Sequence, residues 1–305
     1  MDLVTIDDIR AAAGRIKGVA VRTPLVRMGE AWVKPESLQP VGAFKLRGAY
    51  NAVAALRPDG VVTHSSGNHG QALAYAAREF GVPCVVVVPE GAPKVKLAAI
   101  KGWGAKIAIV PVAERQVVAE RLARERGLTL VPPYDHPLVI AGQGTVGLEI
   151  VEDLPDVEVV LVPVGGGGLG SGVSTAVKAL RPEAKVIGVE PELAADAAES
   201  LAAGRLVEWG LARTFRTMAD GLRTGLSELT FAHLSRRLDG IVTVSEDEIR
   251  AAMGHLARSA RLVAEPSGAV ATAALLSGRV PVPAGRTVAV LSGGNVDPDL
   301  FRQVI

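Results

Sequence analysis

Between residues 61 and 131 the chain alternates short apolar runs with longer amphipathic stretches. The apolar runs at residues 61–64, 84–88 and 106–110 have the length of buried strands, and the stretches between them space their apolar residues as helices do. Glycine or proline ends most of these segments. Strands and helices that alternate with short connections form parallel sheets with right-handed crossovers. The pattern therefore predicts an α/β protein.

A second alternating series begins near residue 142. Its expected strands are residues 159–164, 185–189, 241–244 and 287–291, and its expected helices are residues 142–153, 173–180, 194–203, 228–238, 245–262 and 268–276. A helix at residues 6–16, a short strand at 32–35 and a helix at 43–56 precede both series. We therefore expect two lobes, each a parallel twisted sheet flanked by helices. The small, mobile lobe would comprise residues 60–137, and the large lobe residues 1–59 and 138–305.

Composition narrows the classes of ligand. The 305 residues are 49% hydrophobic but only 4% aromatic, and the formal charge of +1 gives no overall attraction for nucleic acid or an acidic membrane. The longest apolar run, residues 82–89, is far shorter than the roughly 20 residues that cross a bilayer. Residues 1–10 lack a signal-peptide pattern, so we expect a cytoplasmic protein with a small-molecule partner. Cys84 lies among valines and is expected to be a core residue.

A glycine run at residues 165–172 separates an expected strand from an expected helix. Glycines let the backbone approach an anion closely, and the free N–H groups of a helix start can hold a phosphate. The run also contains G-x-G-x-x-G through Gly165, Gly167 and Gly170, with Glu190 at the end of the next strand, as in dinucleotide-binding units. The run alone therefore predicts a phosphorylated cofactor and leaves its identity open.

Three further features belong with this run. Lys45 stands at a helix start, where the helix dipole disfavours a cation, and polar loops follow the strands at residues 65–70 and 292–295. Ligands of open parallel sheets bind beyond the carboxyl ends of the strands. Pyridoxal phosphate would need a lysine for its aldehyde, a phosphate cradle, a donor for its ring oxygen and a partner for its ring nitrogen. Lys45, the glycine run, Asn68 and Ser292 have these chemistries, although each could also be a solvated charge, a helix cap or a turn residue.

Five segments resemble one family. Residues 43–49 (Ala-Phe-Lys-Leu-Arg-Gly-Ala), 65–71 (Ser-Ser-Gly-Asn-His-Gly-Gln), 141–145 (Ala-Gly-Gln-Gly-Thr), 163–170 and 291–295 are similar, in order, to those of the serine/threonine dehydratases and serine racemases. The resemblance covers nearly the whole chain. It implies the tryptophan synthase β-like fold, fold type II of the pyridoxal phosphate enzymes. Because the loop at residues 65–70 belongs to the small lobe and the glycine run to the large one, we expect the small lobe to close over the substrate.

The resemblance also assigns residues to roles. It implies that Lys45 attaches the cofactor and acts as catalytic base. The implied cofactor-binding residues are Phe44, Lys45, Asn68, Gly165, Gly166, Gly167, Gly168, Leu169 and Ser292. The implied substrate-binding residues are Ser65, Ser66, Asn68, His69 and Arg115. The implied reaction removes the β-hydroxyl of L-serine or L-threonine and yields a 2-oxo acid and ammonia.

Details within the motifs leave alternatives open. Ser66 occupies the position of the second catalytic base of serine racemases, but it could instead bind only the substrate carboxylate. Arg115 aligns with an arginine near the racemase active site, yet it lies on a charged helix whose side chains could all be solvated. Racemisation of serine and dehydration of 3-hydroxyaspartate are therefore alternative activities. Ala43 stands where the family usually has serine.

Residues 190–196 resemble the divalent-cation site of eukaryotic serine racemases. The resemblance implies Mg²⁺ or Ca²⁺ on Glu190, Asp196 and the backbone carbonyl of Ala194. Alternatively, Asp196 caps a helix and Glu190 merely ends a strand. The resemblance also implies a homodimer.

Two other classes of protein compete with this interpretation. A nicotinamide-dependent oxidoreductase would use the glycine run but leave Lys45 and Ser292 without roles. A non-catalytic amino-acid-binding protein would keep the cradle and have no need of Lys45.

Overall fold

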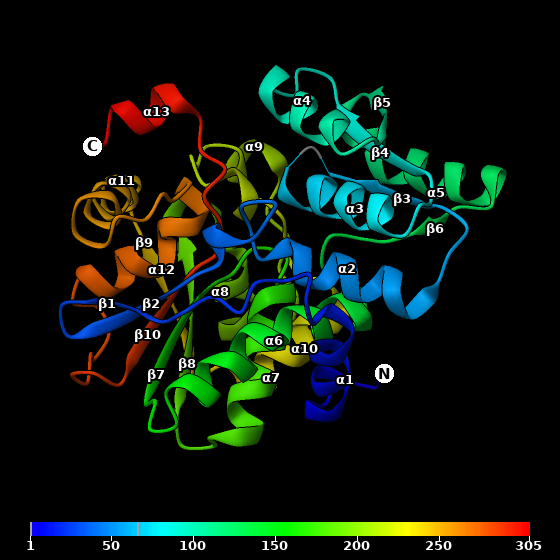
Figure 1. The fold of residues 1–305 in the computed structure, drawn as a ribbon. Coiled ribbons are helices and arrows are strands. Elements are labelled where there is room, and N and C mark those ends of the chain that lie inside the picture. The colour runs from blue at the N-terminus through cyan, green and yellow to red at the C-terminus, as the bar shows by residue number, and fades with distance from the viewer. Residues whose placement is uncertain (1, 66) are drawn as a thin grey trace.

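The computed structural model describes residues 2–65 and 67–305, which form two sheets with helices on both faces of each (Figure 1). The large sheet has the order β1-β2-β10-β7-β8-β9. Its strands are β1 Val26–Met28, β2 Ala31–Pro35, β10 Thr287–Leu291, β7 Val159–Pro163, β8 Lys185–Pro191 and β9 Gly240–Val244. All pairs are parallel except β1 with β2, which form a short antiparallel hairpin at the edge. The sequence pattern did not predict β1, because a three-residue strand is too short to show alternation.

The two faces of the large sheet present alternate residues of the same strands. Val160 and Val162 pack with α6 (Pro137–Asp153) and α7 (Gly168–Leu180) on one side. Leu161, from between them, packs with α11 (Glu246–His255) and α12 (Pro266–Leu276) on the other. A strand buried on both faces is expected to be continuously apolar, as the run in β7 is. This burial fixes the position at which the glycine run leaves the sheet.

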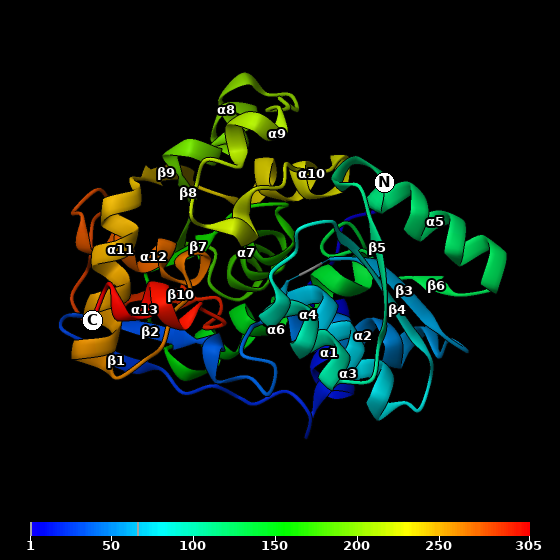
Figure 2. The same ribbon diagram turned by 90° about the horizontal axis from the view of Figure 1, so that it is seen from above.

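The small sheet has the order β5-β4-β3-β6 and is wholly parallel. Its strands are β3 Val61–His64, β4 Cys84–Pro89, β5 Lys106–Val110 and β6 Thr129–Leu130. Val86 and Val88 face α2 (Lys45–Leu56), α3 (Asn68–Glu79) and α4 (Lys94–Gly102), whereas Val85 and Val87 face α5 (Arg115–Arg126). Cys84 is buried among these residues, and burial raises the pKa of its thiol to about 12, as expected of a core cysteine. Figure 2 shows the small sheet and its helices on one side of the molecule and the large sheet on the other.

The remaining helices are α1 Ile6–Ile16, α8 Asp196–Ala203, α9 Leu211–Thr214, α10 Glu228–Arg237 and α13 Pro298–Arg302. Most helices lie within a few residues of their predicted positions. Two begin five residues earlier than predicted: α6 starts at Pro137 because the His136 side chain caps it, and α7 starts at Gly168 because the glycine run forms its first turn. The helix expected at residues 245–262 is α11, capped by Ser245 and Glu248, followed by a π-helical segment at Leu256–Ala260.

Glycines of the 141–145 segment bring α6 against its neighbours. A Cβ atom on Gly142 would lie 2.6 Å from the carbonyl oxygen of Arg47 in α2, and one on Gly144 would lie 3.0 Å from that of Gly172 in α7. At these distances the helices leave room for the hydrogen atoms of glycine but not for a side chain. This motif therefore holds α2 and α7, the two helices whose first residues reach the cavity described below, at fixed positions.

A network of buried, charged side chains holds α2 in place. The Arg47 guanidinium donates to Glu36 and Glu149, and Lys34 Nζ donates to Glu149 Oε2 at 2.6 Å. Arg47, Glu36 and Lys34 are fully buried. Removing one member of such a network leaves an uncompensated buried charge, which typically costs about 3–5 kcal/mol. The arginine that follows Lys45 in the motif thus has a structural role.

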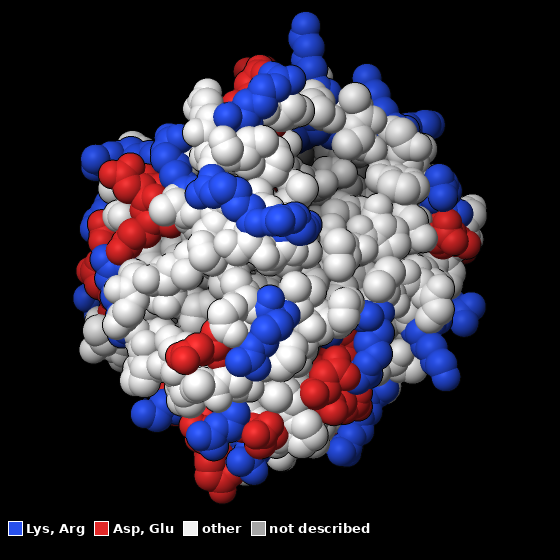
Figure 3. Space-filling view, turned by 60° about the vertical axis from the view of Figure 1, so that its left-hand side comes forward, with Lys and Arg blue, Asp and Glu red and all other residues white. Residues whose placement is uncertain are grey.

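On the face shown in Figure 3, small groups of basic and acidic residues are interspersed around a broad uncharged area, and no single sign dominates. In the part of the chain that the structure describes, no helix has both the length and the apolar character to cross a membrane.

Candidate functional site

A cavity of about 400 Å³ lies where the two lobes meet, beyond the carboxyl ends of β3, β7 and β10. Its wall includes Ser65 after β3, Gly165 after β7 and Ser292 after β10, which belong to the three loops singled out from the sequence. Lys45, at the start of α2, also lines it. The structure therefore brings together residues that are far apart in the chain.

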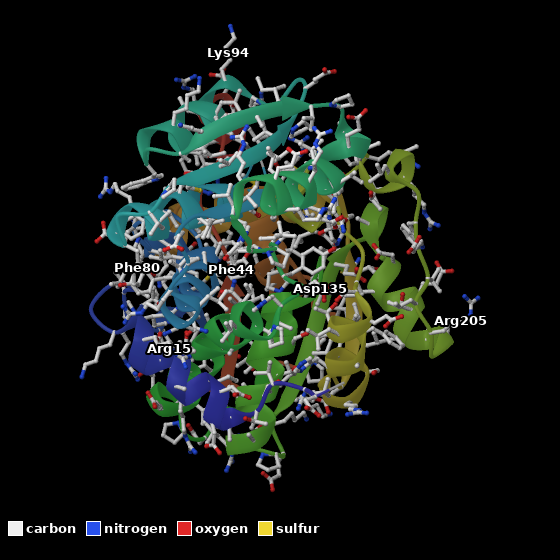
Figure 4. The ribbon with its side chains drawn as sticks, turned by 90° about the vertical axis from the view of Figure 1, so that its right-hand side faces the viewer. Arg15, Phe44, Phe80, Lys94, Asp135 and Arg205 are labelled. Atoms are coloured by element: carbon white, nitrogen blue, oxygen red, sulfur yellow. The ribbon has the colours of Figure 1, made fainter. Side chains whose placement is uncertain are left out.

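Lys45 points its amine at the backbone of the opposite wall. Its Nζ donates to the carbonyl oxygen of Pro133 at 2.7 Å and lies 5.0 Å from the centre of the Phe44 ring. Burial lowers the pKa of Lys45 to about 8, because the cavity solvates the ammonium ion less well than water does. Figure 4 shows Phe44 in the interior of the molecule, whereas Lys94 and Arg205 project outward. An uncharged amine is thus accessible to a reactant at moderate pH.

The loop before Lys45 is joined to the loop after β10. Phe44 N donates to the carbonyl oxygen of Ser292, and Gly294 N donates to that of Gly42. Gly42 has a φ of +70°, and a Cβ there would lie 2.5 Å from Asn295 Oδ1, so this contact requires glycine. The two loops form one unit that sets the position of Lys45 relative to Ser292.

Asn68 begins α3 and is held on both sides of its amide. Its Nδ2 donates to Glu265 Oε1 at 2.6 Å, and its Oδ1 accepts from Asn295 Nδ2 at 2.8 Å. The alternative that Asn68 caps a helix does not hold, because the capping residue of α3 is Gly67 and no side chain caps the helix there. The amide instead faces the cavity wall in a fixed orientation.

The glycine run forms a tight loop whose last members begin α7. Gly167 has a φ of +84°, and no side chain caps the first turn, so free N–H groups of this helix start border the cavity. A Cβ on Gly166 would lie 2.4 Å from the Tyr134 ring, and one on Gly168 would lie 2.8 Å from Tyr134 Cβ. These positions are glycine because Tyr134 packs directly against the backbone of the loop. It combines close backbone approach with a helix N-terminus, the features of an anion cradle.

Ser292 and His69 are buried at other edges of the cavity. The Ser292 hydroxyl makes a long hydrogen bond of 3.4 Å to the carbonyl oxygen of Ser267, so it is weakly held. His69 Nε2 faces the carbonyl oxygen of Val131 at 3.0 Å and must carry the proton, which leaves the buried Nδ1 without a partner among the described residues. Burial and nearby Lys45 lower the pKa of His69 to about 3, so its ring is neutral.

Arg115 lines the cavity from the small lobe as the first residue of α5. Its Nε donates to the carbonyl oxygen of Val112 at 3.0 Å, and no carboxylate of residues 2–65 or 67–305 forms an ion pair with it. Partial burial lowers its pKa. The helix is charged as expected, but its first arginine is half-buried at the cavity. Ser66, the predicted second base, lies outside the described residues.

Several cavity residues had no signal in the sequence. Tyr134 and Glu265 line the cavity, and Lys96 of α4 pairs across its mouth with Asp220 on the large lobe. Burial raises the pKa of Glu265 to about 8, so its carboxyl group is uncharged at neutral pH. The prolines near Tyr134 marked only a turn, and Glu265 before Pro266 marked only a helix start. Their meaning depends on partners distant in the chain.

Glu190 and Asp196 lie away from this cavity. Glu190 Oε1 and Oε2 accept hydrogen bonds from Ala197 N and Ala198 N at 3.1 and 2.7 Å, so Glu190, not Asp196, caps α8. Burial and the neighbouring Asp196 raise the pKa of Glu190 well above its usual value. Across the described residues, no group of three or more acidic, histidine or cysteine side chains is arranged to hold a metal. Since Glu190 faces α8, it cannot serve the glycine run as the ribose-binding acid of a dinucleotide site.

Comparisons with known proteins agree with this arrangement. The model of a family described as "Pyridoxal-phosphate dependent enzyme" matches residues 16–293. The chain belongs to this family. L-threonine ammonia-lyase of Thermotoga maritima is 42% identical over 99% of this chain and 78% of its own. L-threo-3-hydroxyaspartate ammonia-lyase of Saccharomyces cerevisiae is 40% identical over 100% of this chain and 97% of its own. The structure of maize serine racemase superposes with a TM-score of 0.92 and 36% identity, covering 99% of this chain and 97% of that one.

Membership in the pyridoxal phosphate family makes the fold one of fold type II, as predicted, and the cavity fits the cofactor on structural grounds. The lysine amine is buried and partly deprotonated, and the glycine loop with the start of α7 forms an uncapped anion cradle. Asn68 and the weakly held Ser292 hydroxyl supply polar groups at separate edges. The nicotinamide alternative has no support from these comparisons.

Proposed function

We propose that the chain catalyses the pyridoxal-phosphate-dependent β-elimination of a hydroxy amino acid, such as L-serine or L-threonine, to a 2-oxo acid and ammonia. The observation that carries this proposal is the position of the Lys45 amine together with its lowered pKa. The amine lies in the cavity, forms no ion pair with a carboxylate of residues 2–65 or 67–305, and has a pKa lowered to about 8. An amine in that range can attach an aldehyde and later exchange a proton.

Each edge of the cofactor has a proposed partner. The N–H groups of residues 165–169 would hold the phosphate, the Asn68 amide would donate to the ring oxygen, Ser292 would meet the ring nitrogen, and Phe44 would pack beside the ring. A serine hydroxyl is neutral, so it does not stabilise a positive charge on the ring nitrogen as an aspartate would. When bound, the cofactor supplies an aldehyde for amine attachment and a conjugated ring that withdraws electrons from the α-carbon.

Lys45 performs the proton transfer. In the loaded enzyme the Lys45 Nζ would remove the substrate α-proton, because its lowered pKa leaves part of the amine unprotonated. The start of α3 lacks a side-chain cap, so its free backbone N–H groups, that of Asn68 among them, would bind the substrate carboxylate together with Ser65. The neutral His69 cannot attract that carboxylate by charge, so it contributes shape and a hydrogen bond.

A second candidate substrate is 3-hydroxyaspartate, the substrate named for the yeast relative. Arg115 supports it, since its half-buried guanidinium, which pairs with no carboxylate of the described residues, is suited to bind a second substrate carboxylate. Serine racemisation, named for the maize and Schizosaccharomyces pombe relatives, depends on Ser66 and stays a prediction from the resemblance.

A divalent cation at Glu190, Asp196 and the carbonyl oxygen of Ala194 belongs to the same proposal. Two adjacent buried carboxyl groups with raised pKa values support it, because a cation would relieve their repulsion. The homodimer is likewise proposed from the resemblance, and the cytoplasmic location stays a prediction from the sequence.

We also propose that residues 60–137 move relative to residues 1–59 and 138–305 when substrate binds. The Lys96–Asp220 ion pair across the cavity mouth supports closure. Because α2 shares the core of the small sheet, the movement must shear that helix against its neighbours. Exchanging the charges, Lys96→Asp with Asp220→Lys, should restore the substrate KM that either single change raises. Equal KM values in all four proteins would contradict the role of this pair.

The activity is tested by incubating the pyridoxal-phosphate-loaded protein with L-serine, L-threonine or 3-hydroxyaspartate and measuring ammonia and 2-oxo acid together. Stoichiometric formation of both products from at least one substrate is expected, and Lys45→Ala should form neither. Amino acid binding without product would instead favour the non-catalytic alternative.

A further inference from the structure

Glu265 is a buried carboxyl group for which the proposed chemistry has no task. It is 6% exposed and precedes α12, where its backbone N–H donates to the carbonyl oxygen of Gly293. One side-chain oxygen accepts from Asn68 Nδ2 at 2.6 Å, and this is its one side-chain hydrogen bond among the described residues. A buried carboxyl normally has more partners, so its position requires an explanation.

The residue packed against Glu265 leaves just enough room for its hydrogen bond to Asn68. A Cβ atom on Gly293 would lie 2.3 Å from Glu265 Oε1 and 3.1 Å from Asn68 Nδ2. Glycine at residue 293 therefore makes room for the hydrogen bond between the two side chains. The loop after β10 carries this glycine and also carries Asn295, which donates to the opposite side of the Asn68 amide at 2.8 Å.

The hydrogen bonds determine how Asn68 is oriented. Asn295 Nδ2 is committed to Val41 O and Asn68 Oδ1, both at 2.8 Å, so it holds the Asn68 carbonyl oxygen on its own side. Glu265 then holds one of the two Asn68 Nδ2 hydrogens, and the other remains free. Exchanging the amide oxygen and nitrogen would place two N–H groups against each other and break the bond from Asn295. The free hydrogen thus has a fixed direction.

We propose that Glu265 is a positioning residue, which together with Asn295 fixes the Asn68 amide so that its free N–H meets the ring hydroxyl oxygen of pyridoxal phosphate. This inference rests on the proposed contact between Asn68 and the cofactor. Asp220 and burial keep the Glu265 carboxyl largely uncharged at neutral pH, against the opposite effects of Asn68 and Lys96. A neutral carboxyl adds no negative charge beside the electron-rich ring oxygen.

The test measures how tightly the apoprotein binds the cofactor. The apoprotein is titrated with pyridoxal phosphate, and binding is monitored by absorbance. Glu265→Leu removes the acceptor and is expected to weaken binding by about five- to tenfold, the usual effect of one lost buried hydrogen bond. Glu265→Gln keeps an acceptor and a neutral side chain, so it should bind within about twofold of the wild type. Thr272→Val in α12 is the matched control and should leave binding unchanged. It removes a buried hydroxyl that has no hydrogen-bond partner among the described residues.

A double-mutant cycle separates positioning from general damage. In an Asn68→Ala background, Glu265→Leu should cause no further loss, because the residue through which it acts is gone. A cofactor analogue without the ring hydroxyl should bind wild type and Glu265→Leu equally. If Glu265→Leu fails to fold, Asn295→Asp replaces the donor on the other side of the amide and should show the same dependence on Asn68.

Wild-type binding by Glu265→Leu would overturn the inference, as would an equal loss in the Asn68→Ala background. If Asn68→Ala itself binds the cofactor as the wild type does, the contact between Asn68 and the ring is wrong and this inference falls with it. Product formation by the wild type is measured separately and would stand in either case.

Discussion

Lys45 Nζ and the carbonyl oxygen of Pro133 lie 2.7 Å apart, so the amine at the start of α2 contacts the segment that connects the small sheet to α6. The bond uses one N–H of Lys45 and leaves its lone pair available when the amine is uncharged. With a pKa of about 8, roughly a tenth of the amine is in that form at pH 7.

The reactivity of Lys45 in the apoprotein should follow this pKa. Labelling by an amine-reactive reagent should rise about tenfold per pH unit up to about pH 8 and then level off, because only the uncharged amine reacts. Mass spectrometry of digests, with exposed Lys94 as the internal reference for the reagent, measures the profile. A midpoint near 10.5, the value of an unperturbed lysine, would contradict the effect of burial.

Gly166→Ala should impair the phosphate cradle. Its methyl group would overlap the Tyr134 ring, so the loop or the ring must shift, at a cost of about 1–3 kcal/mol in stability. We expect cofactor affinity to fall at least tenfold in an apoprotein titration. Gly14→Ala in α1 is the matched control, because its methyl group meets nothing within 4 Å, and it should raise stability by about 0.5–1 kcal/mol. Unchanged affinity in Gly166→Ala would argue against a cradle here.

Arg115→Gln should discriminate between substrates. Losing a charge-assisted hydrogen bond of about 1.5–3 kcal/mol should raise the KM for 3-hydroxyaspartate by about ten- to a hundredfold. L-Serine has no second carboxylate, so its KM should change less than about threefold. Arg121→Gln, at an exposed position of the same helix, serves as the control. Equal effects on both substrates would contradict the assignment of Arg115 to the side-chain carboxylate.

The Glu190–Asp196 pair should make stability depend on pH and on Mg²⁺. Both folded-state pKa values are raised, so without a cation their contribution is present at low pH and is lost as pH rises from 4.5 through the raised pKa of Glu190. Mg²⁺ should therefore raise Tm more at neutral than at acidic pH, by about 2–5 °C.

Glu190→Gln should abolish the Mg²⁺ effect and flatten the pH dependence. Differential scanning calorimetry with chelator or with Mg²⁺ measures both quantities. A wild-type Tm that is the same in chelator and in Mg²⁺ at every pH would count against a cation at these residues.

Much of the fold follows from local apolar patterns. Val159–Pro163 is buried on both faces, so its unbroken apolar run identifies it without knowledge of its partners. The chain order of strands and glycine-rich loops then placed Lys45, Asn68, the glycine run and Ser292 at one cavity. The edge strand β1 and the early start of α7 depend on a hairpin partner and on backbone contacts with Tyr134, which no local pattern reports.

The supporting residues could not be predicted in the same way. Glu265 lies 197 positions from Asn68 in the chain, and only the meeting of three loops gives its carboxyl a partner. Arg115 looked like part of a solvated charged helix because many of its neighbours in the sequence are charged, and its position at the first turn brings it to the cavity. Glu190 matched a dinucleotide pattern by spacing, while the direction of its side chain is set by α8.

The central claim is that Lys45 attaches the cofactor. Borohydride reduction of the pyridoxal-phosphate-loaded protein makes that attachment permanent, and peptide mass spectrometry then locates it. We predict a single phosphopyridoxyl group on the peptide that contains Lys45, and none in Lys45→Ala. Attachment to another cavity lysine such as Lys96, or no attachment in a wild-type protein that forms product, would contradict the account.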